Sequence, residues 1–228
     1  MLRSGLRARF AVAAGLLLSG ALTGCKKAVE PLTVETLTLV SGDLQTRQAG
    51  RQLKSPLVFR ATNSGGKAAG GAVITIVVLQ GGGSVDSASL KTDANGEARV
   101  KWTLGPEASQ ALQATVSGLE PMRVTAIGIL PSDIVIAQGN NQSAKVSIGL
   151  LNPVVVRVIG ANNVPMDSIN VSFQITGGGG AIVPQSVFTN SVGEATVKWT
   201  MGPIAGTNTA LVRAALIDPV TITATATP

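Results

Sequence analysis

Apolar and polar residues alternate along several short stretches of this chain, and turn-forming residues separate most of the stretches. Residues 97–103 read "EARVKWT", in which Ala98, Val100 and Trp102 share one parity and mostly charged residues share the other. Successive side chains of an extended chain point to opposite faces, so this pattern predicts a strand with one face on a core. Strand-like stretches lie at 35–42, 56–62, 71–79, 84–92, 97–104, 110–117 and 122–129. No segment after residue 25 has helical periodicity.

The same pattern occurs twice. Residues 96–106 read "GEARVKWTLGP" and residues 193–203 read "GEATVKWTMGP", which places Lys101 and Lys198 97 residues apart. The same offset aligns the glycine runs at 81–83 and 178–180, and it increases by one after the tryptophan phrase. About seven short strands in each copy are typical of an immunoglobulin-like β-sandwich. We therefore predict an all-β protein with two tandem Ig-like β-sandwiches, at residues 37–129 and 130–228.

Three short motifs recur in both copies. The first copy contains "SGGKAAGGAVITIVV", "GGGSV" and "TDANGEA", and the second contains "NNVPMDSINVSFQI", "GGGGAI" and "TNSVGEA". These motifs resemble those of the bacterial Ig-like domains of the invasin/intimin type, called Big-1. The second copy departs from the family at Asn190, where the family has Asp, and the first copy lacks the proline of the first motif. The resemblance implies an extracytoplasmic β-sandwich used as a spacer or an adhesive module.

The N-terminal segment differs in composition from the rest of the chain. Three arginines within the first nine residues precede "FAVAAGLLLSGAL" at 10–22, an apolar run of 13 residues. A membrane-spanning helix needs about 20 apolar residues, whereas a signal-peptide core is shorter. The segment therefore predicts a signal peptide over residues 1–24.

The signal peptide ends in "LTGC", which resembles the lipobox of bacterial lipoproteins. By this resemblance Leu22, Thr23 and Gly24 are recognised by the signal peptidase, and Cys25 carries acyl chains that anchor the protein to a membrane. An ordinary signal peptide or anchor helix with an accidental cysteine is the alternative. Residues 25–36 would form a membrane-proximal tether. Lys26 is not the acidic residue linked to inner-membrane retention in enterobacterial lipoproteins, which favours the outer membrane, with a periplasmic or surface-exposed chain.

Composition excludes several classes of site. The chain has no His, no Tyr and one Cys, so Ser-His-Asp, Cys-His and His-based zinc sites cannot form. Removal of residues 1–24 would leave 15 of the 18 basic residues against 12 acidic ones, a net charge near +3. These charges are scattered and do not alternate with aromatic residues, so we expect no nucleic-acid binding. The possible carboxylate pair Asp86 and Asp93 has no counterpart in the second copy, and we predict no enzymatic activity.

The stretch "DANGE" at 93–97 has two interpretations. Asp93, Asn95 and Glu97 offer oxygen ligands to calcium, but a calcium site needs six or more oxygens. Alternatively, Gly96 supplies the left-handed residue of a hairpin turn. The second copy keeps the turn glycine, Gly193, but not the full ligand set. This favours the turn, and we predict no metal and no cofactor other than the acyl chains on Cys25.

Two further features are possible ligand-binding sites. The glycine runs could cradle a phosphate, but strands rather than helices follow them, so we interpret them as flexible corners between strands. Trp102 and Trp199 could be exposed platforms for sugars, but each shares parity with apolar neighbours. We therefore predict that both tryptophans belong to the core.

The preferred interpretation is a non-enzymatic cell-envelope lipoprotein. Its Ig-like domains would serve as a surface stalk, or as an adhesion or docking surface for a protein or glycan partner that the sequence does not name. A carbohydrate-binding accessory lipoprotein is the alternative, and it would need solvent-exposed aromatic side chains. A metal-dependent hydrolase is a more distant third.

Overall fold

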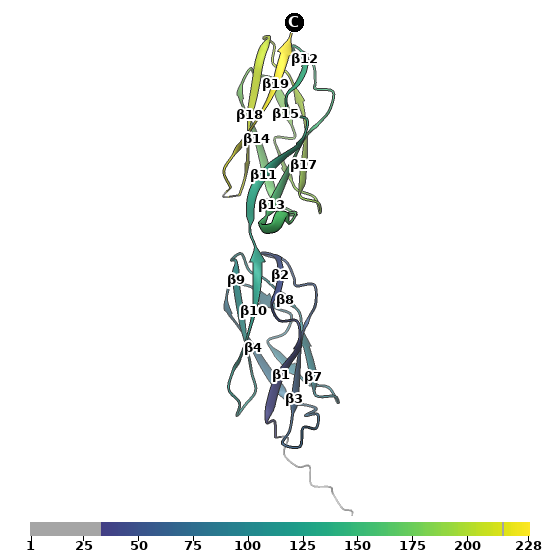
Figure 1. Cartoon of the computed structure of the whole chain (residues 1–228), viewed down its shortest axis with the longest axis vertical. Coiled ribbons are helices and arrows are strands. Elements are labelled where there is room, and N and C mark those ends of the chain that lie inside the picture. The colour runs from purple at the N-terminus through teal and green to yellow at the C-terminus, as the bar shows by residue number, and fades with distance from the viewer. Residues whose placement is uncertain (1–32, 216) are drawn as a thin grey trace, which may run out of the picture. The chain divides into compact units, whose positions relative to one another are not determined.

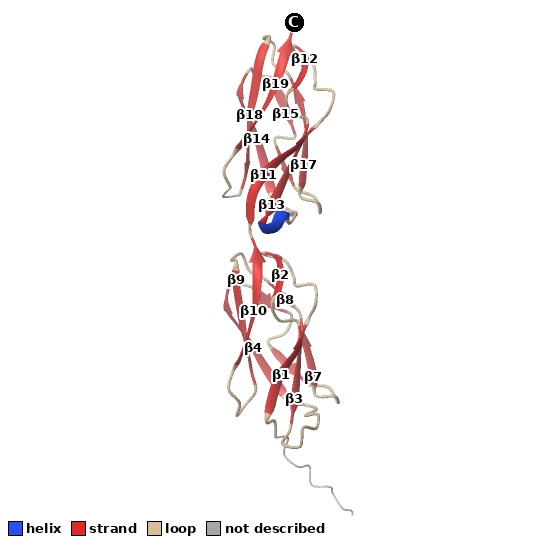
Figure 2. Cartoon of the chain, viewed as in Figure 1, coloured by secondary structure: helices blue, strands red, loops and turns tan. Residues whose placement is uncertain are grey.

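The computed structural model describes residues 33–215 and 217–228. The predicted signal peptide, the lipobox residues Leu22 to Cys25 and most of the predicted tether lie outside the described residues. The described chain is almost entirely β-structure, in two β-sandwiches that follow one another along the sequence (Figures 1 and 2). A single turn of 3-10 helix, η1 (Ala161–Asn163), is the exception among the described residues.

The first sandwich contains a three-stranded sheet in the order β1-β3-β7 and a five-stranded sheet in the order β2-β10-β9-β4-β6. A short pair, β5-β8, completes it. The strands are β1 (Thr36–Ser41), β2 (Gln45–Gln48), β3 (Leu57–Thr62), β4 (Val73–Gln80), β5 (Ser84–Val85), β6 (Ser89–Lys91), β7 (Glu97–Val100), β8 (Trp102–Thr103), β9 (Ser109–Thr115) and β10 (Met122–Ile129).

The second sandwich repeats this plan with a four-stranded sheet, β11-β13-β17-β15, and a five-stranded sheet, β12-β19-β18-β14-β16. The strands are β11 (Pro131–Gln138), β12 (Gln142–Lys145), β13 (Val154–Gly160), β14 (Asn170–Gly177), β15 (Ala181–Val183), β16 (Ser186–Phe188), β17 (Glu194–Thr200), β18 (Gly206–Ala214) and β19 (Val220–Thr227). Two mainly antiparallel sheets around one core in each repeat make both sandwiches Ig-like.

In each sandwich the chain passes from one sheet to the other at a glycine that follows the first strand. β1 pairs antiparallel with β3, but β2 pairs parallel with β10 in the other sheet. Gly42 lies between β1 and β2 with a φ of 99°, and a Cβ at this position would lie 2.6 Å from the carbonyl oxygen of Pro56. Gly139 occupies the same place in the second sandwich, with a φ of 84°. The sequence pattern missed β2 because "QTRQ" contains no apolar residue, and its pairing depends on backbone groups alone.

The stretch at 84–92 is not one strand. β5 pairs with β8, whereas β6 pairs with β4 in the other sheet. Asp86 separates them: its amide donates to Lys101 O at 3.1 Å, and its Oδ1 accepts from Lys101 N at 2.9 Å. The chain therefore crosses between sheets where the residue pattern alone predicted a continuous extended segment.

Each sandwich has its own core with one tryptophan. Trp102 is 0% exposed and packs among aliphatic side chains such as Leu57 and Leu112. Trp199 is 1% exposed and packs in the second core with Val156 and Val212. The alternating residues of 97–103 carry these contacts, since Ala98, Val100 and Trp102 are all buried.

Candidate functional site

The turn at 93–97 uses its acidic residue for backbone hydrogen bonds. Asp93 Oδ1 accepts from the amides of Asn95 and Glu97 at 2.8 and 2.9 Å. Gly96 has a φ of 74°, in the left-handed region that the turn requires. The described residues contain no group of three or more His, Cys, Asp or Glu side chains that could hold a metal ion.

The second sandwich builds the same turn with an amide. Asn190 Oδ1 accepts from the amides of Val192 and Glu194, both at 3.0 Å, and Gly193 has a φ of 79°. A carboxylate and a carboxamide both supply this oxygen. The feature repeated at this position is therefore an accepting oxygen as well as a turn glycine.

The glycine runs are closely packed corners. A Cβ on Gly105 would lie 1.7 Å from Gly81 O, and a Cβ on Gly202 would lie 1.6 Å from Gly178 O. The backbones touch at these points, so there is no room for a phosphate between them. The "LGP" and "MGP" ends of the tryptophan phrase are thus the partners of the glycine runs.

The tryptophans offer no exposed ring. Both indole Nε1 atoms are buried and have no hydrogen-bond partner among the residues described. Because the two sandwiches share this arrangement, it belongs to the core of the repeat. One aromatic side chain of the described range is exposed: Phe188, on the edge strand β16, is 66% exposed. The sequence pattern did not single out this residue.

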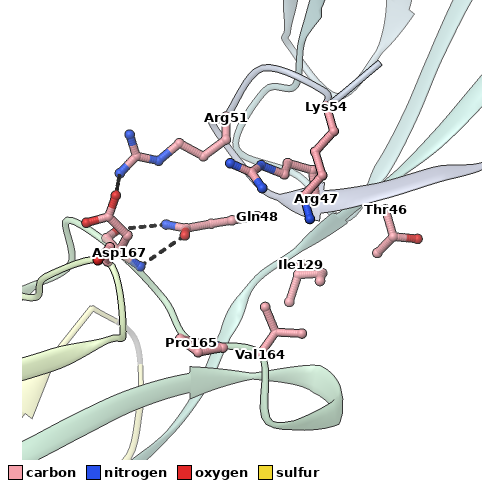
Figure 3. A pocket seen from close by; sticks show the side chains of 10 residues that line it. Thr46, Arg47, Gln48, Arg51, Lys54, Ile129, Val164, Pro165 and Asp167 are labelled. Carbon is pink, nitrogen blue, oxygen red and sulfur yellow. Dashed lines mark hydrogen bonds and ion pairs between the residues drawn. The ribbon is translucent and has the colours of Figure 1, made fainter. Parts of the chain in front are cut away.

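Polar contacts join the first sandwich to the second. Gln48 Nε2 donates to Asp167 O at 2.8 Å, and Gln48 Oε1 accepts from Asp167 N at 3.0 Å (Figure 3). Arg51 Nη2 lies 2.6 Å from Asp167 Oδ2 and also donates to Ser168 Oγ at 2.8 Å. The side chains of Arg51 and Asp167 are each 37% exposed, so solvent screens this ion pair.

A cavity of about 330 Å³ lies beside these contacts. It is lined by Thr46, Arg47, Gln48, Arg51, Lys54, Ile129, Val164, Pro165, Asp167 and Ser191 (Figure 3). Three of these side chains are cationic and one is anionic. Four of its ten lining residues are therefore charged.

Sequence reasoning missed this site because the charges looked scattered. A signal was present in "TRQAGRQLK" at 46–54, which has three cations in nine residues. The repeat places Ala144, Ile148 and Leu151 opposite Arg47, Arg51 and Lys54. The three cations of this stretch are therefore present in the first copy only.

The outer surfaces of the two sandwiches also differ. On β4, Val73, Val77 and Leu79 are about half exposed, at 54%, 48% and 49%. The repeat places exposed polar residues at the corresponding positions of β14, namely Asn170, Gln174 and Thr176. Thr75 and its counterpart Ser172 are exposed and polar on both strands, so the outward faces differ at these three positions, which are apolar in the first sandwich and polar in the second.

At one end of the second sandwich the exposed residues are apolar, and their counterparts in the first sandwich are charged. Ile148, Leu151 and Ile204 are 55%, 92% and 74% exposed, and we call these three residues the apolar tip. Their loops are held together, since Ser147 N donates to Gly202 O at 3.1 Å. The first sandwich has Arg51, Lys54 and Glu107 at the equivalent positions.

This chain is similar to known proteins in structure but not detectably in sequence. No protein-family model and no characterised protein matches the sequence. Among solved structures, the D0-D1 domain of intimin is 15% identical and has a TM-score of 0.35, with 84% of this chain and 95% of that chain covered. The adhesin InvE of Yersinia pseudotuberculosis is 16% identical, with a TM-score of 0.42 and 86% and 61% covered.

Invasin, described as a bacterial integrin-binding protein, is 20% identical and has a TM-score of 0.46, with 85% of this chain and 40% of that chain covered. At these identities and TM-scores, the similarities do not indicate what this chain binds. The Ig-like fold rests on the strand order and pairing of its own sheets. In the described range, no helix is both long and apolar enough to cross a membrane.

Proposed function

We propose that this protein is a non-enzymatic lipoprotein of the cell envelope whose two Ig-like sandwiches serve as a stalk and as a docking surface. The observation that carries the proposal is that the sandwiches share their folding residues but expose apolar side chains at different places. Val77 is exposed where its counterpart is Gln174, and Leu151 is exposed where its counterpart is Lys54. Exposed clusters of aliphatic residues indicate contact surfaces for other macromolecules.

Aliphatic side chains favour a protein partner over a glycan. Sugar recognition commonly uses exposed aromatic rings, and Phe188 is the one such ring among the described residues. A protein surface, in contrast, can bury Ile148, Leu151 and Ile204 and gain free energy from the apolar area removed from water. The carbohydrate-binding alternative would be supported if Phe188→Ala abolished binding to a glycan.

Photo-crosslinking in the source cells tests the docking function. A photoreactive phenylalanine analogue at position 151 or 77 should give a discrete crosslinked product, and position 174, which matches position 77 on the second sandwich, should give less. The product at 151 should disappear when the other two residues of the tip are changed to their counterparts, Ile148→Arg and Ile204→Glu. Equal crosslinking at positions 77, 151 and 174 would contradict the proposal.

The membrane anchor is part of the same proposal. Acyl chains on Cys25 would hold the protein at the outer membrane, since each buried methylene contributes about 0.8 kcal/mol of membrane affinity. The native protein should incorporate labelled palmitate and accumulate as a precursor when lipoprotein signal peptidase is inhibited by globomycin. Cys25→Ser should lose both properties, and a Cys25→Ser protein that still fractionates with the outer membrane would contradict the anchor.

A further inference from the structure

The cavity beside the contact between the two sandwiches carries excess positive charge. Arg51 is neutralised by Asp167, at 2.6 Å. Arg47 and Lys54 also line the cavity, but neither forms an ion pair or a side-chain hydrogen bond with any residue that the structure describes. Two positive charges therefore face the cavity without an acidic partner (Figure 3).

Arg47 has an additional unpaired donor. Its Nε atom is buried and has no hydrogen-bond partner among the described residues. A guanidinium group has five N–H donors in a fixed plane that matches the two oxygens of a carboxylate. An oxyanion that enters the cavity would match this guanidinium, which has no acidic partner among the described residues.

The repeat shows that these cations are not needed for folding. The second sandwich folds with Ala144 in place of Arg47 and with Leu151 in place of Lys54. The neighbouring Gln45, which the fold does use, is kept as Gln142 and makes the same backbone hydrogen bonds. Arg47 and Lys54 are thus replaced by uncharged residues in the second sandwich, whereas Gln45 is kept.

We propose that this cavity binds a carboxylate side chain of an acidic peptide segment in a partner protein, with Arg47 and Lys54 as the recognising residues. This rests on the docking function proposed above and gives the partner a chemical class. Arg47 lies on β2, an edge strand paired on one side with β10, which leaves backbone groups for an extended peptide.

The remaining lining also favours a peptide. Ile129, Val164 and Pro165 offer an apolar surface for a side chain next to the carboxylate. None of the lining residues is aromatic, so a sugar ring would have nothing to stack on. The cavity therefore combines the charge that an acidic residue needs with an apolar wall that suits its neighbour in a peptide.

Calorimetric titration of the full-length protein tests this proposal. The probe is a blocked octapeptide of alternating glutamate and valine, and the matched peptide has glutamine in place of glutamate. We expect the glutamate peptide to bind, more weakly as salt is raised, and the glutamine peptide not to bind. Arg47→Ala and Lys54→Leu should each lower the affinity about tenfold or more. Both variants carry the residues of the second sandwich, and both should keep the native melting temperature.

Lys67→Leu is the control, because Lys67 is an exposed lysine of the first sandwich that does not line the cavity. It should leave the affinity unchanged. Native-like binding by the Arg47→Ala, Lys54→Leu double variant would overturn the proposal, and so would the absence of any binding to the native protein. Tighter binding of a galacturonate oligosaccharide of equal charge, lost in the double variant, would overturn the peptide assignment and replace it with an acidic glycan.

Failure here is separable from failure of the docking function. The crosslinking at positions 77 and 151 does not involve Arg47 or Lys54. If the tip crosslinks a partner while the acidic peptide fails to bind, the docking function stands and the cavity assignment is overturned. If the acidic peptide binds but the tip crosslinks no partner, the cavity assignment stands and the docking function of the tip is overturned.

Discussion

The two sandwiches have closely similar polar contacts within each fold but differ in the residues that they expose on their surfaces. Gln45 and Gln142 each donate to two backbone carbonyls and accept from one amide, at 2.8, 2.9 and 3.0 Å in both sandwiches. Val77 and Gln174, in contrast, occupy equivalent exposed places with opposite polarity. The comparison separates residues that the fold requires from residues that are available for binding.

Where the two sequences differ in a shared contact, the chemistry is retained. Gln110 Oε1 accepts from Gly105 N at 3.0 Å, and Asn208 Oδ1 accepts from Gly202 N at the same distance. The second sandwich has one more residue in the loop before this position and a side chain shorter by one methylene group. This loop is where the offset between the two copies increases by one.

The largest expected effect concerns the contact between each glycine run and its Gly-Pro partner. Gly105→Ala and Gly202→Ala should each destabilise their own sandwich by about 4 kcal/mol or more, because the added methyl group would overlap a backbone carbonyl. Denaturant unfolding followed by tryptophan fluorescence measures this, since each sandwich contains one tryptophan. Gly149→Ala is the control, because the nearest atom to its added Cβ lies 3.9 Å away. Equal stability of Gly105→Ala and Gly149→Ala would contradict this packing.

The next effect tests whether the two cores are equivalent. Trp102→Ala and Trp199→Ala should each cost about 3–5 kcal/mol, since each removes a buried indole. Denaturant unfolding followed by far-UV circular dichroism measures the loss, because each variant lacks the tryptophan of the sandwich that it destabilises. The emission of the native protein should be blue-shifted and resistant to quenchers. A readily quenched native emission would mean that the rings are exposed and would restore the sugar-platform hypothesis.

A smaller effect concerns a buried hydroxyl in each sandwich. Thr92 Oγ1 donates to Ala69 O at 2.6 Å and accepts from Ala72 N at 2.9 Å. Thr189 makes the equivalent two bonds, also at 2.6 and 2.9 Å. Thr92→Val and Thr189→Val keep the shape and leave a buried amide unpaired, so each should cost about 1–3 kcal/mol. Chemical denaturation should give similar losses for both, and a loss in one only would break the equivalence.

The smallest effect concerns the turn oxygen. Asp93→Asn and Asn190→Asp should each change the free energy of unfolding by less than about 0.5 kcal/mol, because both side chains keep Oδ1. Asp93→Ala should cost about 1 kcal/mol, since the amides of Asn95 and Glu97 lose their acceptor. Calcium added during the same unfolding measurements should change the stability of neither the native protein nor the Asp93→Asn variant. A calcium-dependent rise in stability that Asp93→Asn removes would revive the metal site.

The repeat and the alternating strands are visible in the amino-acid sequence, and together they predict the two Ig-like sandwiches. Residues 97–103 show why: a strand with one face on a core must place Ala98, Val100 and Trp102 on the same side, and period-two alternation is visible without a structure. The resemblance of short motifs to Big-1 domains led to the same fold.

Which residues contact one another depends on the packing of segments that are distant in the sequence. β2 has no apolar pattern because it is held by backbone pairing with β10, and such pairing leaves no trace in side-chain hydrophobicity. The glycine runs are explained by contacts with Gly105 and Gly202, which lie further along the chain and leave no room for a Cβ atom. Arg47 and Lys54 form a site with Val164 and Pro165 because the second sandwich closes one side of the cavity. Contacts of this kind depend on how distant segments pack. A local sequence pattern can therefore indicate the residues but cannot predict which of them are in contact.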